Sequence, residues 1–238
     1  MRRFHSPDID PETGFVTLDR EQAAHARSVL RLREGDTVGV FDGNGNEFLC
    51  EIGSIGKREA VLKIVRQIDP PALESPLELT LAAAILKNEK FDLVIQKSVE
   101  LGVSRLIPLL TKRTEAQARG AEKRIERWKR IAVESSKQCG RAKVMEIGTP
   151  SGLSEIAGRS ADLKIVFAEG GGSGLPNGAK PESVIAVVGP EGGWEEEELA
   201  ALLETGFHRV TLGGRILRAE TAAIAAAALL QHRFGDLA

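Results

Sequence analysis

Two glycine-rich turns in the C-terminal third of the chain are the residues whose types and spacing point most directly to chemistry. One reads GPEGGW (Gly189 to Trp194), the other LGGRILRAETA (Leu212 to Ala222), and each follows a strand-like apolar run and opens a predicted helix. Glycine admits close backbone approach to a ligand but also serves a plain tight turn, so either turn alone favours a ligand site only weakly. Because the carboxyl ends of parallel strands meet at one edge of a sheet, the pair together predicts a ligand site there.

Several common ligand and catalytic motifs are missing from the sequence. There is no GxxxxGK[ST] phosphate loop, and GGGSGLPNG has its glycines at the wrong offsets for a dinucleotide fingerprint, so ATP and NAD are poorly supported. HExxH and GxSxG are missing as well. Cys50, Cys139 and the four scattered histidines lack metal-ligand spacing, so we expect no metal and no disulfide.

Basic residues are concentrated in the middle of the chain. Residues 85–145 hold 15 Lys and Arg against 7 Asp and Glu, whereas the rest of the chain holds 17 against 27. Such a block is expected in a protein that binds a polyanion such as nucleic acid, and a solvated helix face explains it about equally well. The N-terminal residues lack the apolar run of a signal peptide and no apolar stretch is long enough to span a bilayer, so we expect a cytoplasmic protein without membrane insertion.

The elements that must position these residues fall into two groups. Alternating apolar residues predict short strands in the first seventy residues, which suggests a small β-barrel; the strands are expected at 15–18, 36–42, 47–54 and 59–68. A helix over 21–31 interrupts them, with Asp19 as its N-cap and Gln22 as the capping-box partner. Three prolines between Asp69 and Pro76 end the pattern. We therefore place one domain at 1–70, a linker at 71–76 and a second domain at 77–238.

Strands and helices alternate beyond the linker, which predicts an α/β fold with a parallel sheet covered by helices. Strands are expected at 77–86, 104–110, 163–168, 183–189 and 209–212. Helices are expected at 88–102, 122–138, 194–204 and 221–234, with a further short helix beginning at Ser151. Phe91 and Trp128 fit helical spacing and are predicted to be core residues.

The segments VVGPEGGW, LGGRILRAETA and QHRFGDLA resemble the RsmE family, SPOUT-superfamily enzymes that methylate N3 of one uridine in 16S ribosomal RNA. MRRFH, HARSVLRLREGD, ILKNEKFDLVIQKSVELGV and RWKRIAVESSKQCGR resemble other segments of that family in the same order, so the resemblance covers nearly the whole chain. One departure is Met145, where the family pattern has proline.

The resemblance implies a fold, a cofactor and partners. The fold would be a SPOUT-type α/β domain with a C-terminal deep trefoil knot, joined to an N-terminal PUA-like or OB-like β-barrel. Three loops would hold S-adenosylmethionine; the matching residues are Ala168, Glu169, Val188, Gly189, Glu191, Gly192, Gly193, Leu212, Gly213, Ile216, Leu217, Arg218 and Ala219. The partners would be 16S rRNA of the small ribosomal subunit and a second copy of the chain.

Arg218 and Glu220 are the predicted catalytic residues. Uracil N3 must lose its proton, and Glu220 is the nearest acidic candidate for the base, although an ordinary first-turn carboxylate explains it equally well. Arg218 would orient the uracil or stabilise its developing oxyanion. The side chains predicted to bind RNA phosphates are Arg3, Arg27, Arg31, Lys87, Lys97, Arg113 and Arg141.

Two other functions remain open at this point. A non-catalytic RNA-binding assembly factor of the same fold would share the basic block but need no cofactor pocket. A nucleotide-dependent small-molecule enzyme would require the missing phosphate motifs and would leave the basic block without a use.

Overall fold

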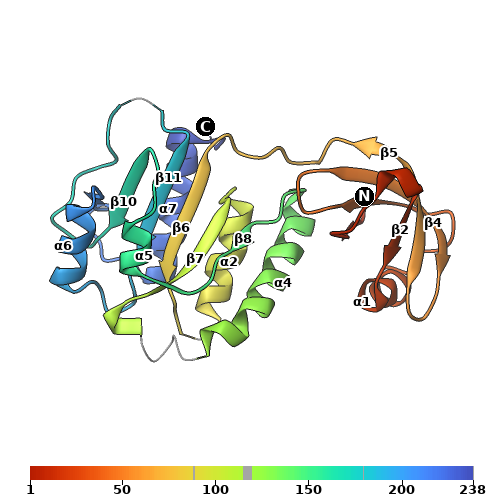
Figure 1. Cartoon of the computed structure of the whole chain (residues 1–238), viewed down its shortest axis with the longest axis horizontal. Coiled ribbons are helices and arrows are strands. Elements are labelled where there is room, and N and C mark those ends of the chain that lie inside the picture. The colour runs from red at the N-terminus through yellow and green to blue at the C-terminus, as the bar shows by residue number, and fades with distance from the viewer. Residues whose placement is uncertain (88, 115–119, 179, 238) are drawn as a thin grey trace. The chain divides into compact units, whose positions relative to one another are not determined.

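The computed structural model describes residues 1–87, 89–114, 120–178 and 180–237, and the chain forms two compact units (Figure 1). The first unit comprises Met1–Glu74 together with Ser136–Val144, and the second comprises Ser75–Ser135 and Met145–Ala238. The first boundary therefore falls within the expected linker. Nothing in the sequence indicated that residues 136–144, which include the end of the basic helix, would join the first unit.

The first unit is built on a five-stranded sheet with the order β1-β3-β4-β5-β2. β1 pairs parallel with β3, and the other pairs are antiparallel. The strands are β1 (Arg3–His5), β2 (Phe15–Leu18), β3 (Thr37–Phe41), β4 (Glu47–Ile55) and β5 (Ala60–Ile68), with a 3₁₀ turn, η1, at Pro11–Thr13. The sequence did not predict β1, because its three residues are too few to show a period.

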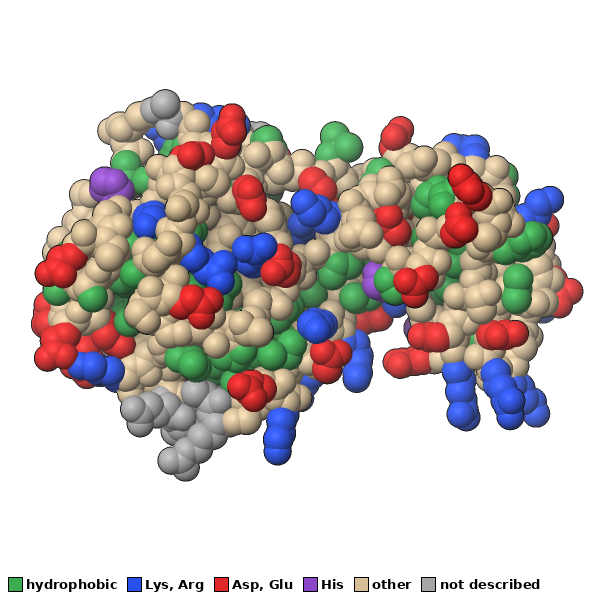
Figure 2. Space-filling model, in the orientation of Figure 1, with side chains coloured by type: hydrophobic (Ala, Val, Ile, Leu, Met, Phe, Trp, Pro, Cys, Tyr) green, Lys and Arg blue, Asp and Glu red, His purple; other side chains and the backbone are tan. Residues whose placement is uncertain are grey.

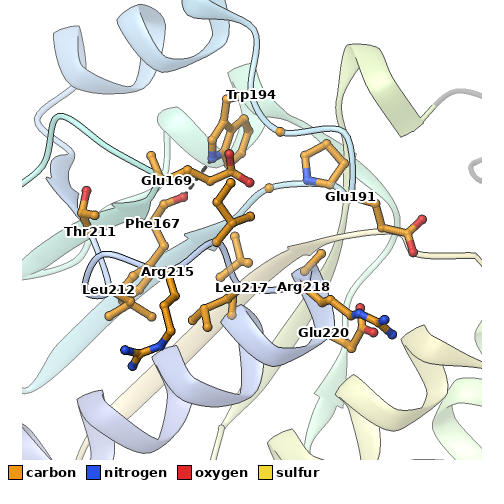
Figure 3. A pocket seen from close by; sticks show the side chains of 18 of the residues that line it. Phe167, Glu169, Glu191, Trp194, Thr211, Leu212, Arg215, Leu217, Arg218 and Glu220 are labelled. Carbon is orange, nitrogen blue, oxygen red and sulfur yellow. Dashed lines mark hydrogen bonds between the residues drawn. The ribbon is translucent and has the colours of Figure 1, made fainter.

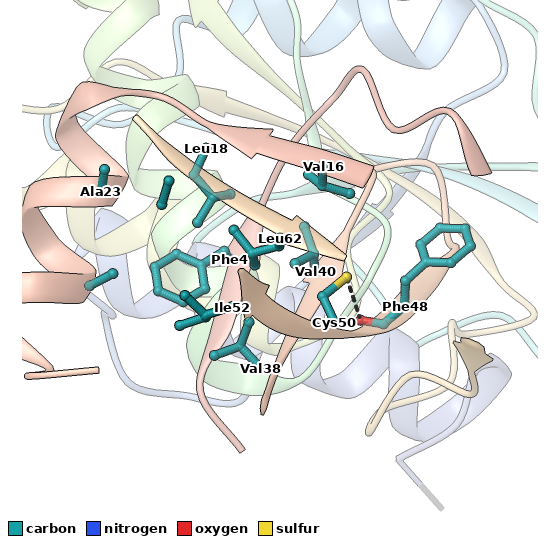
Figure 4. Close-up of a cluster of buried hydrophobic side chains, with 12 residues drawn as sticks. Phe4, Val16, Leu18, Ala23, Val38, Val40, Phe48, Cys50, Ile52 and Leu62 are labelled. Carbon is teal, nitrogen blue, oxygen red and sulfur yellow. Dashed lines mark hydrogen bonds between the residues drawn. The ribbon is translucent and has the colours of Figure 1, made fainter. Parts of the chain in front are cut away.

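The core of the first unit comes from alternate strand residues. In β2, for example, Val16 and Leu18 are buried while Phe15 and Thr17 are exposed, as the period of two requires. Figure 4 shows these side chains meeting Phe4 and the inward residues of the other strands. One sheet face thus encloses the apolar core.

The helix of the first unit starts as predicted but continues differently. α1 (Arg20–Ala24) begins at Asp19, whose carboxylate accepts the backbone N–H of Gln22 at 2.8 Å. The prediction of Gln22 as the capping-box partner was wrong, because its side-chain amide exchanges two hydrogen bonds with the backbone of His5. A π-helical turn, η2 (His25–Val29), follows, and Arg31 then has a positive φ of 55°.

The second unit contains a parallel sheet with the order β12-β10-β11-β6-β7-β8, and β9 pairs with β7 beside β8. The strands are β6 (Glu78–Ala84), β7 (Arg105–Leu110), β8 (Glu146–Ile147), β9 (Ser151–Gly152), β10 (Leu163–Phe167), β11 (Ser183–Val188) and β12 (His208–Val210). The α/β class expected from the sequence is confirmed. Ser151 lies in β9, so the short helix begins two residues later than expected.

Helices cover both faces of this sheet. α2 (Lys90–Glu100) and α7 (Ala219–Phe234) pack on each other, and α7 also lies against β6 and β11. The other face carries α5 (Leu153–Ala157) and α6 (Glu196–Glu204), whose apolar residues join a buried cluster with Val166, Ile185 and Val187. α4 (Ala121–Cys139) places Trp128 against Phe91 of α2, with ring centroids 4.8 Å apart. Both aromatic residues are buried, as predicted.

A short 3₁₀ turn, η3 (Lys112–Thr114), follows β7. Across the described ranges of the chain, no helix is both long enough and apolar enough to cross a membrane.

Candidate active site

A cavity of about 300 Å³ lies at the carboxyl ends of β10 and β11 and beside the segment that follows β12 (Figure 3). Its walls come from the end of β10, the end of β11 and the turn after it, the segment between β12 and α7, the first turn of α7, and the first residue of α2. This is where parallel sheets commonly bind ligands, because successive loops leave the strands on the same side.

The sheet order determines which strand ends meet at the pocket. The two glycine turns follow β11 and β12, which are successive strands in the chain, but β10 lies between them in the sheet. Residues at the end of β10 therefore form the middle of the pocket wall. Three strand ends therefore contribute to the site, as the three loops implied by the family resemblance require.

Hydrogen bonds fix these three segments to one another. The N–H of Ala168 donates to the carbonyl of Val210 at 3.0 Å, and the N–H of Thr211 donates to the carbonyl of Ser173 at 3.0 Å. The indole Nε1 of Trp194 donates to the carbonyl of Phe167 at 2.9 Å (Figure 3). Backbone and indole hydrogen bonds thus hold the pocket wall together.

Glycine is required at particular positions of the turns. A Cβ on Gly189 would lie 2.7 Å from the ring of Trp194, far inside normal contact distance. Gly193 and Gly213 have φ values of 76° and 65°, in the left-handed region that L side chains rarely adopt. The motif residues therefore serve both chain geometry and close approach to the cavity.

The structure brings most of the predicted cofactor residues around this one cavity. Twelve of the thirteen line it, namely Ala168, Glu169, Val188, Gly189, Glu191, Gly193, Leu212, Gly213, Ile216, Leu217, Arg218 and Ala219. Gly192 is not among the lining residues and faces Arg113 instead, where a Cβ would lie 3.1 Å from Cδ of that side chain.

Several lining residues were not named in the sequence analysis as cofactor ligands. They are Lys90, Phe167, Pro190, Trp194, Thr211, Arg215, Glu220 and Ala222, of which only Glu220 had been assigned a role. Most lie inside the two glycine motifs, at positions that had been given no cofactor role, and Thr211 directly precedes the second motif. Lys90 could not have been found from these motifs, because it lies 101 positions before its pocket partner Glu191 in the sequence.

Arg218 and Glu220 lie at the same end of the pocket in Figure 3. Arg218 is the N-cap residue of α7 with extended backbone (φ −62°, ψ 150°), and its side chain makes no capping hydrogen bond. Glu220 is in the first turn of α7, and its side chain is 12% exposed. Its Oε2 atom is buried, and no donor in the described part of the chain reaches it.

A lysine links two carboxylates at this end of the pocket. The ammonium of Lys90 donates to Glu191 and lies 3.6 Å from Oε1 of Glu220. The pKa of Lys90 is raised above its usual value, chiefly by the hydrogen bond to Glu191. The Lys90 side chain is therefore a charged ammonium at neutral pH.

The lining suits S-adenosylmethionine. A volume of about 300 Å³ is at the lower end of the range for small-molecule sites. Apolar side chains such as Leu212 and Leu217 provide contact area, the glycine turns offer bare backbone, and Glu169 provides negative charge that favours a sulfonium cation. The residues present therefore fit the cofactor that the resemblance implied.

Two of the predicted phosphate-binding arginines are buried in ion pairs of the first unit, and we withdraw that prediction for both. The guanidinium of Arg3 contacts both carboxylate oxygens of Glu47, at 2.9 and 2.8 Å, and donates to the carbonyls of Ser136 and Arg141. Arg141 pairs with Glu74 at 2.6 Å. Their side chains are only 6% and 5% exposed, so neither can reach a phosphate.

The other predicted phosphate-binding side chains are accessible to different degrees. Arg27, Arg31 and Lys87 are exposed. Lys97 pairs with Glu100 on its own helix, and Arg113 pairs with Glu195 and donates to the carbonyl of Gly192. Figure 2 shows Lys and Arg side chains projecting together from one edge of the first unit.

Family models match both parts of the chain. Residues 73–231 match an RNA methyltransferase domain, and residues 18–65 match an RNA methyltransferase PUA domain. The α/β class and the PUA-like N-terminal domain expected from the sequence are therefore confirmed.

Individual proteins are similar over nearly the full length. The ribosomal RNA small subunit methyltransferase E of Buchnera aphidicola is 34% identical over 230 residues, which cover 93% of this chain and 92% of that protein. The crystal structure of the Neisseria gonorrhoeae protein of the same name, bound to S-adenosyl methionine, is 33% identical with a TM-score of 0.91 and full coverage of both chains. A putative methyltransferase from Legionella pneumophila, in complex with bound SAM, has a TM-score of 0.90 at 33% identity and 99% coverage of each chain. The chain described here therefore belongs to the ribosomal RNA small subunit methyltransferase E family.

Proposed function

We propose that this protein transfers a methyl group from S-adenosylmethionine to N3 of a uridine in the 16S rRNA of the small ribosomal subunit. The observation that carries the proposal is the pocket itself, where bare glycine turns and apolar side chains form a cofactor-sized cavity with Arg218 and Glu220 at one end. The cofactor supplies an electrophilic methyl group when bound.

The residues of the chain act mainly by positioning. Bringing uracil N3 to within reach of the methyl group at a fixed angle removes much of the entropic barrier to an in-line displacement. Arg218 is exposed and free of a capping bond, so its guanidinium is available to orient the uracil or stabilise negative charge on a uracil oxygen. Glu220, with one oxygen unpartnered, is placed to accept the N3 proton, a contribution of about 10²- to 10⁴-fold in rate.

The first unit would hold RNA. Arg27 lies in the π-helical turn and Arg31 has a positive φ, and such local departures from regular backbone often occur at functional sites. Both side chains are exposed. Lys87 of the second unit is exposed as well, and these three predicted phosphate contacts form no salt bridge within the described part of the chain.

The knot expected from the resemblance is also part of this proposal. Val210 forms a bridge with Ser173, and Thr211 Oγ1 accepts the N–H of Gly172 at 3.1 Å, so the loop after β10 lies against the segment that leads into α7. These contacts support a chain path in which the segment before α7 passes through that loop. We further propose a homodimer that works in the cytoplasm, in line with the resemblance.

Two measurements test the proposed activity. Isothermal titration with S-adenosylmethionine should show binding of one cofactor per chain, and a tritiated-methyl assay should label small subunits from a strain that lacks the gene. Mass spectrometry of the RNA should then place the methyl group on uridine N3. Binding of RNA without cofactor binding would support the non-catalytic assembly factor instead.

A further inference from the structure

Lys90 joins three elements that form the pocket. It is the first residue of α2, its ammonium donates to Glu191 in the turn after β11, and it lies 3.6 Å from Glu220 in the first turn of α7. In Figure 3 the labelled Glu191 and Glu220 lie at the same end of the pocket as Arg218. The lysine thus stands between two carboxylates beside the proposed catalytic pair.

The position of Lys90 is not explained by the stability of its own helix. The N-terminus of a helix carries partial positive charge, which favours carboxylates and disfavours a cation in the first turn. The pKa of Lys90 is nevertheless raised, first by the hydrogen bond to Glu191 and further by the charges of Glu191 and Glu220. The favourable contacts of this lysine are therefore with the pocket rather than with α2.

The two oxygens of Glu220 have different surroundings. Oε1 faces the ammonium of Lys90, whereas Oε2 is buried with no hydrogen-bond donor among the described residues. A buried carboxylate oxygen without a partner is costly, and a catalytic role is one physical reason for its presence. The ammonium thus lies beside Oε1, and Oε2 has no partner among the described residues.

We propose that Lys90 is a positioning residue for methyl transfer, holding the Glu220 carboxylate with Oε1 toward the ammonium and Oε2 free to accept the uracil N3 proton. This inference rests on the proposed function. In the step, the N3 proton passes to Oε2, the N3 electron pair forms the new bond to the methyl carbon, and the electrons of the broken carbon–sulfur bond remain on sulfur.

The kinetic test compares Lys90→Met with Lys90→Arg. Lys90→Met should lower kcat at least tenfold while the Kd for S-adenosylmethionine, measured by calorimetry, changes by less than about threefold. Lys90→Arg keeps the charge and should recover a third or more of the wild-type kcat. Lys112→Met is the matched control, since Lys112 also pairs with a glutamate, Glu197, but does not line the pocket.

A double-mutant cycle then tests whether Lys90 acts through Glu220. If it does, Lys90→Met should cause little further loss of kcat in a Glu220→Gln background, because residues that act as a unit are not additive. Additive losses, a wild-type kcat in Lys90→Met, or a parallel loss of cofactor affinity would each overturn the inference.

A measurement without turnover tests the bridge itself. In protein labelled with ¹³C at the lysine ε-carbon, NMR titration should show that Glu191→Gln lowers the pKa of Lys90 toward its ordinary value, and that the fall is smaller in Glu220→Gln. An unchanged titration in both variants would mean that the bridge does not form. A wild-type enzyme that fails to methylate small subunits would instead refute the proposed function, whatever the titration shows.

Discussion

Gly189 and Trp194 show at the residue scale how closely the pocket wall is packed. The indole ring occupies the space that a Cβ on Gly189 would need, and the indole N–H is fixed by the carbonyl of Phe167. Glycine here is a steric requirement, whereas at Gly193 and Gly213 it is a requirement of backbone angle. One amino acid type thus meets two different physical needs within one site.

Gly189→Ala should weaken both the fold and the cofactor site. Moving the indole aside to admit a methyl group costs about 1–3 kcal/mol and displaces a wall of the cavity. We expect urea unfolding to show that loss and calorimetry to show at least a tenfold weaker affinity for S-adenosylmethionine. Gly174→Ala is the control, because a Cβ there would meet nothing within 4 Å.

Arg218→Ala should abolish methyl transfer while leaving cofactor binding mostly intact. The proposed role of the guanidinium is toward uracil, and it makes no capping hydrogen bond whose loss would disturb α7. A fall in kcat of about 10²-fold or more is the expected size for losing a group that stabilises developing charge. Equal activity of variant and wild type in the tritiated-methyl assay would remove that role.

At the element scale, the turn after β11 is held in place by its neighbours. The buried carboxylate of Glu198 accepts the N–H of Lys112 in η3 at 2.9 Å and the N–H of Glu195 at the start of α6 at 3.1 Å. Arg113 of η3 adds an ion pair to Glu195. The end of β7 thereby braces the segment that leads from the glycine turn into α6.

Glu198→Ala should destabilise the second unit far more than an exposed substitution on the same helix. It leaves two backbone N–H groups without their acceptor, at a cost of about 1–3 kcal/mol each. Urea denaturation should therefore give a large loss of unfolding free energy for Glu198→Ala and almost none for Glu204→Ala, which is exposed near the end of α6. Similar losses in the two variants would contradict the bracing role.

At the scale of the whole molecule, the number of basic side chains differs from the number that are free to contact RNA phosphates. The first unit contains arginines of two kinds. Arg3 and Arg141 are buried in ion pairs with Glu47 and Glu74, whereas Arg27 and Arg31, in and after the π-helical turn, are exposed to solvent. Only the second kind can release counterions from a nucleic acid. Excess positive charge in the sequence therefore overstates the number of possible phosphate contacts.

Affinity for small-subunit RNA should fall with added salt by about one power of salt concentration per contacted phosphate. Arg27→Ala should reduce that slope by about one and leave the unfolding free energy nearly unchanged. Arg3→Ala should leave the salt slope unchanged and lower the unfolding free energy by about 3–5 kcal/mol, because it leaves the fully buried Glu47 carboxylate unpaired. Filter binding over a series of salt concentrations, with denaturation of each variant, distinguishes the two. A flat salt profile for the wild type would contradict phosphate binding.

The sequence by itself determined the α/β class, the position of nearly every longer strand and helix, and the two glycine motifs of the pocket. These follow from local rules, since a hydrophobic period, a cap or a glycine turn involves residues only a few positions apart. Arg218 and Glu220 were predicted as catalytic residues because they lie inside such a motif.

Only the tertiary structure decided the order β12-β10-β11, the approach of Lys90 to Glu191, and the burial of Arg3 and Arg141. Lys90 and Glu191 are 101 residues apart, and Arg3 donates to the carbonyl of Arg141 over 138 residues. No local pattern records such pairs, because they depend on which distant surfaces are buried together. The physical reason is that side-chain type and spacing determine where a helix or strand forms, whereas tertiary packing determines which other elements lie next to it.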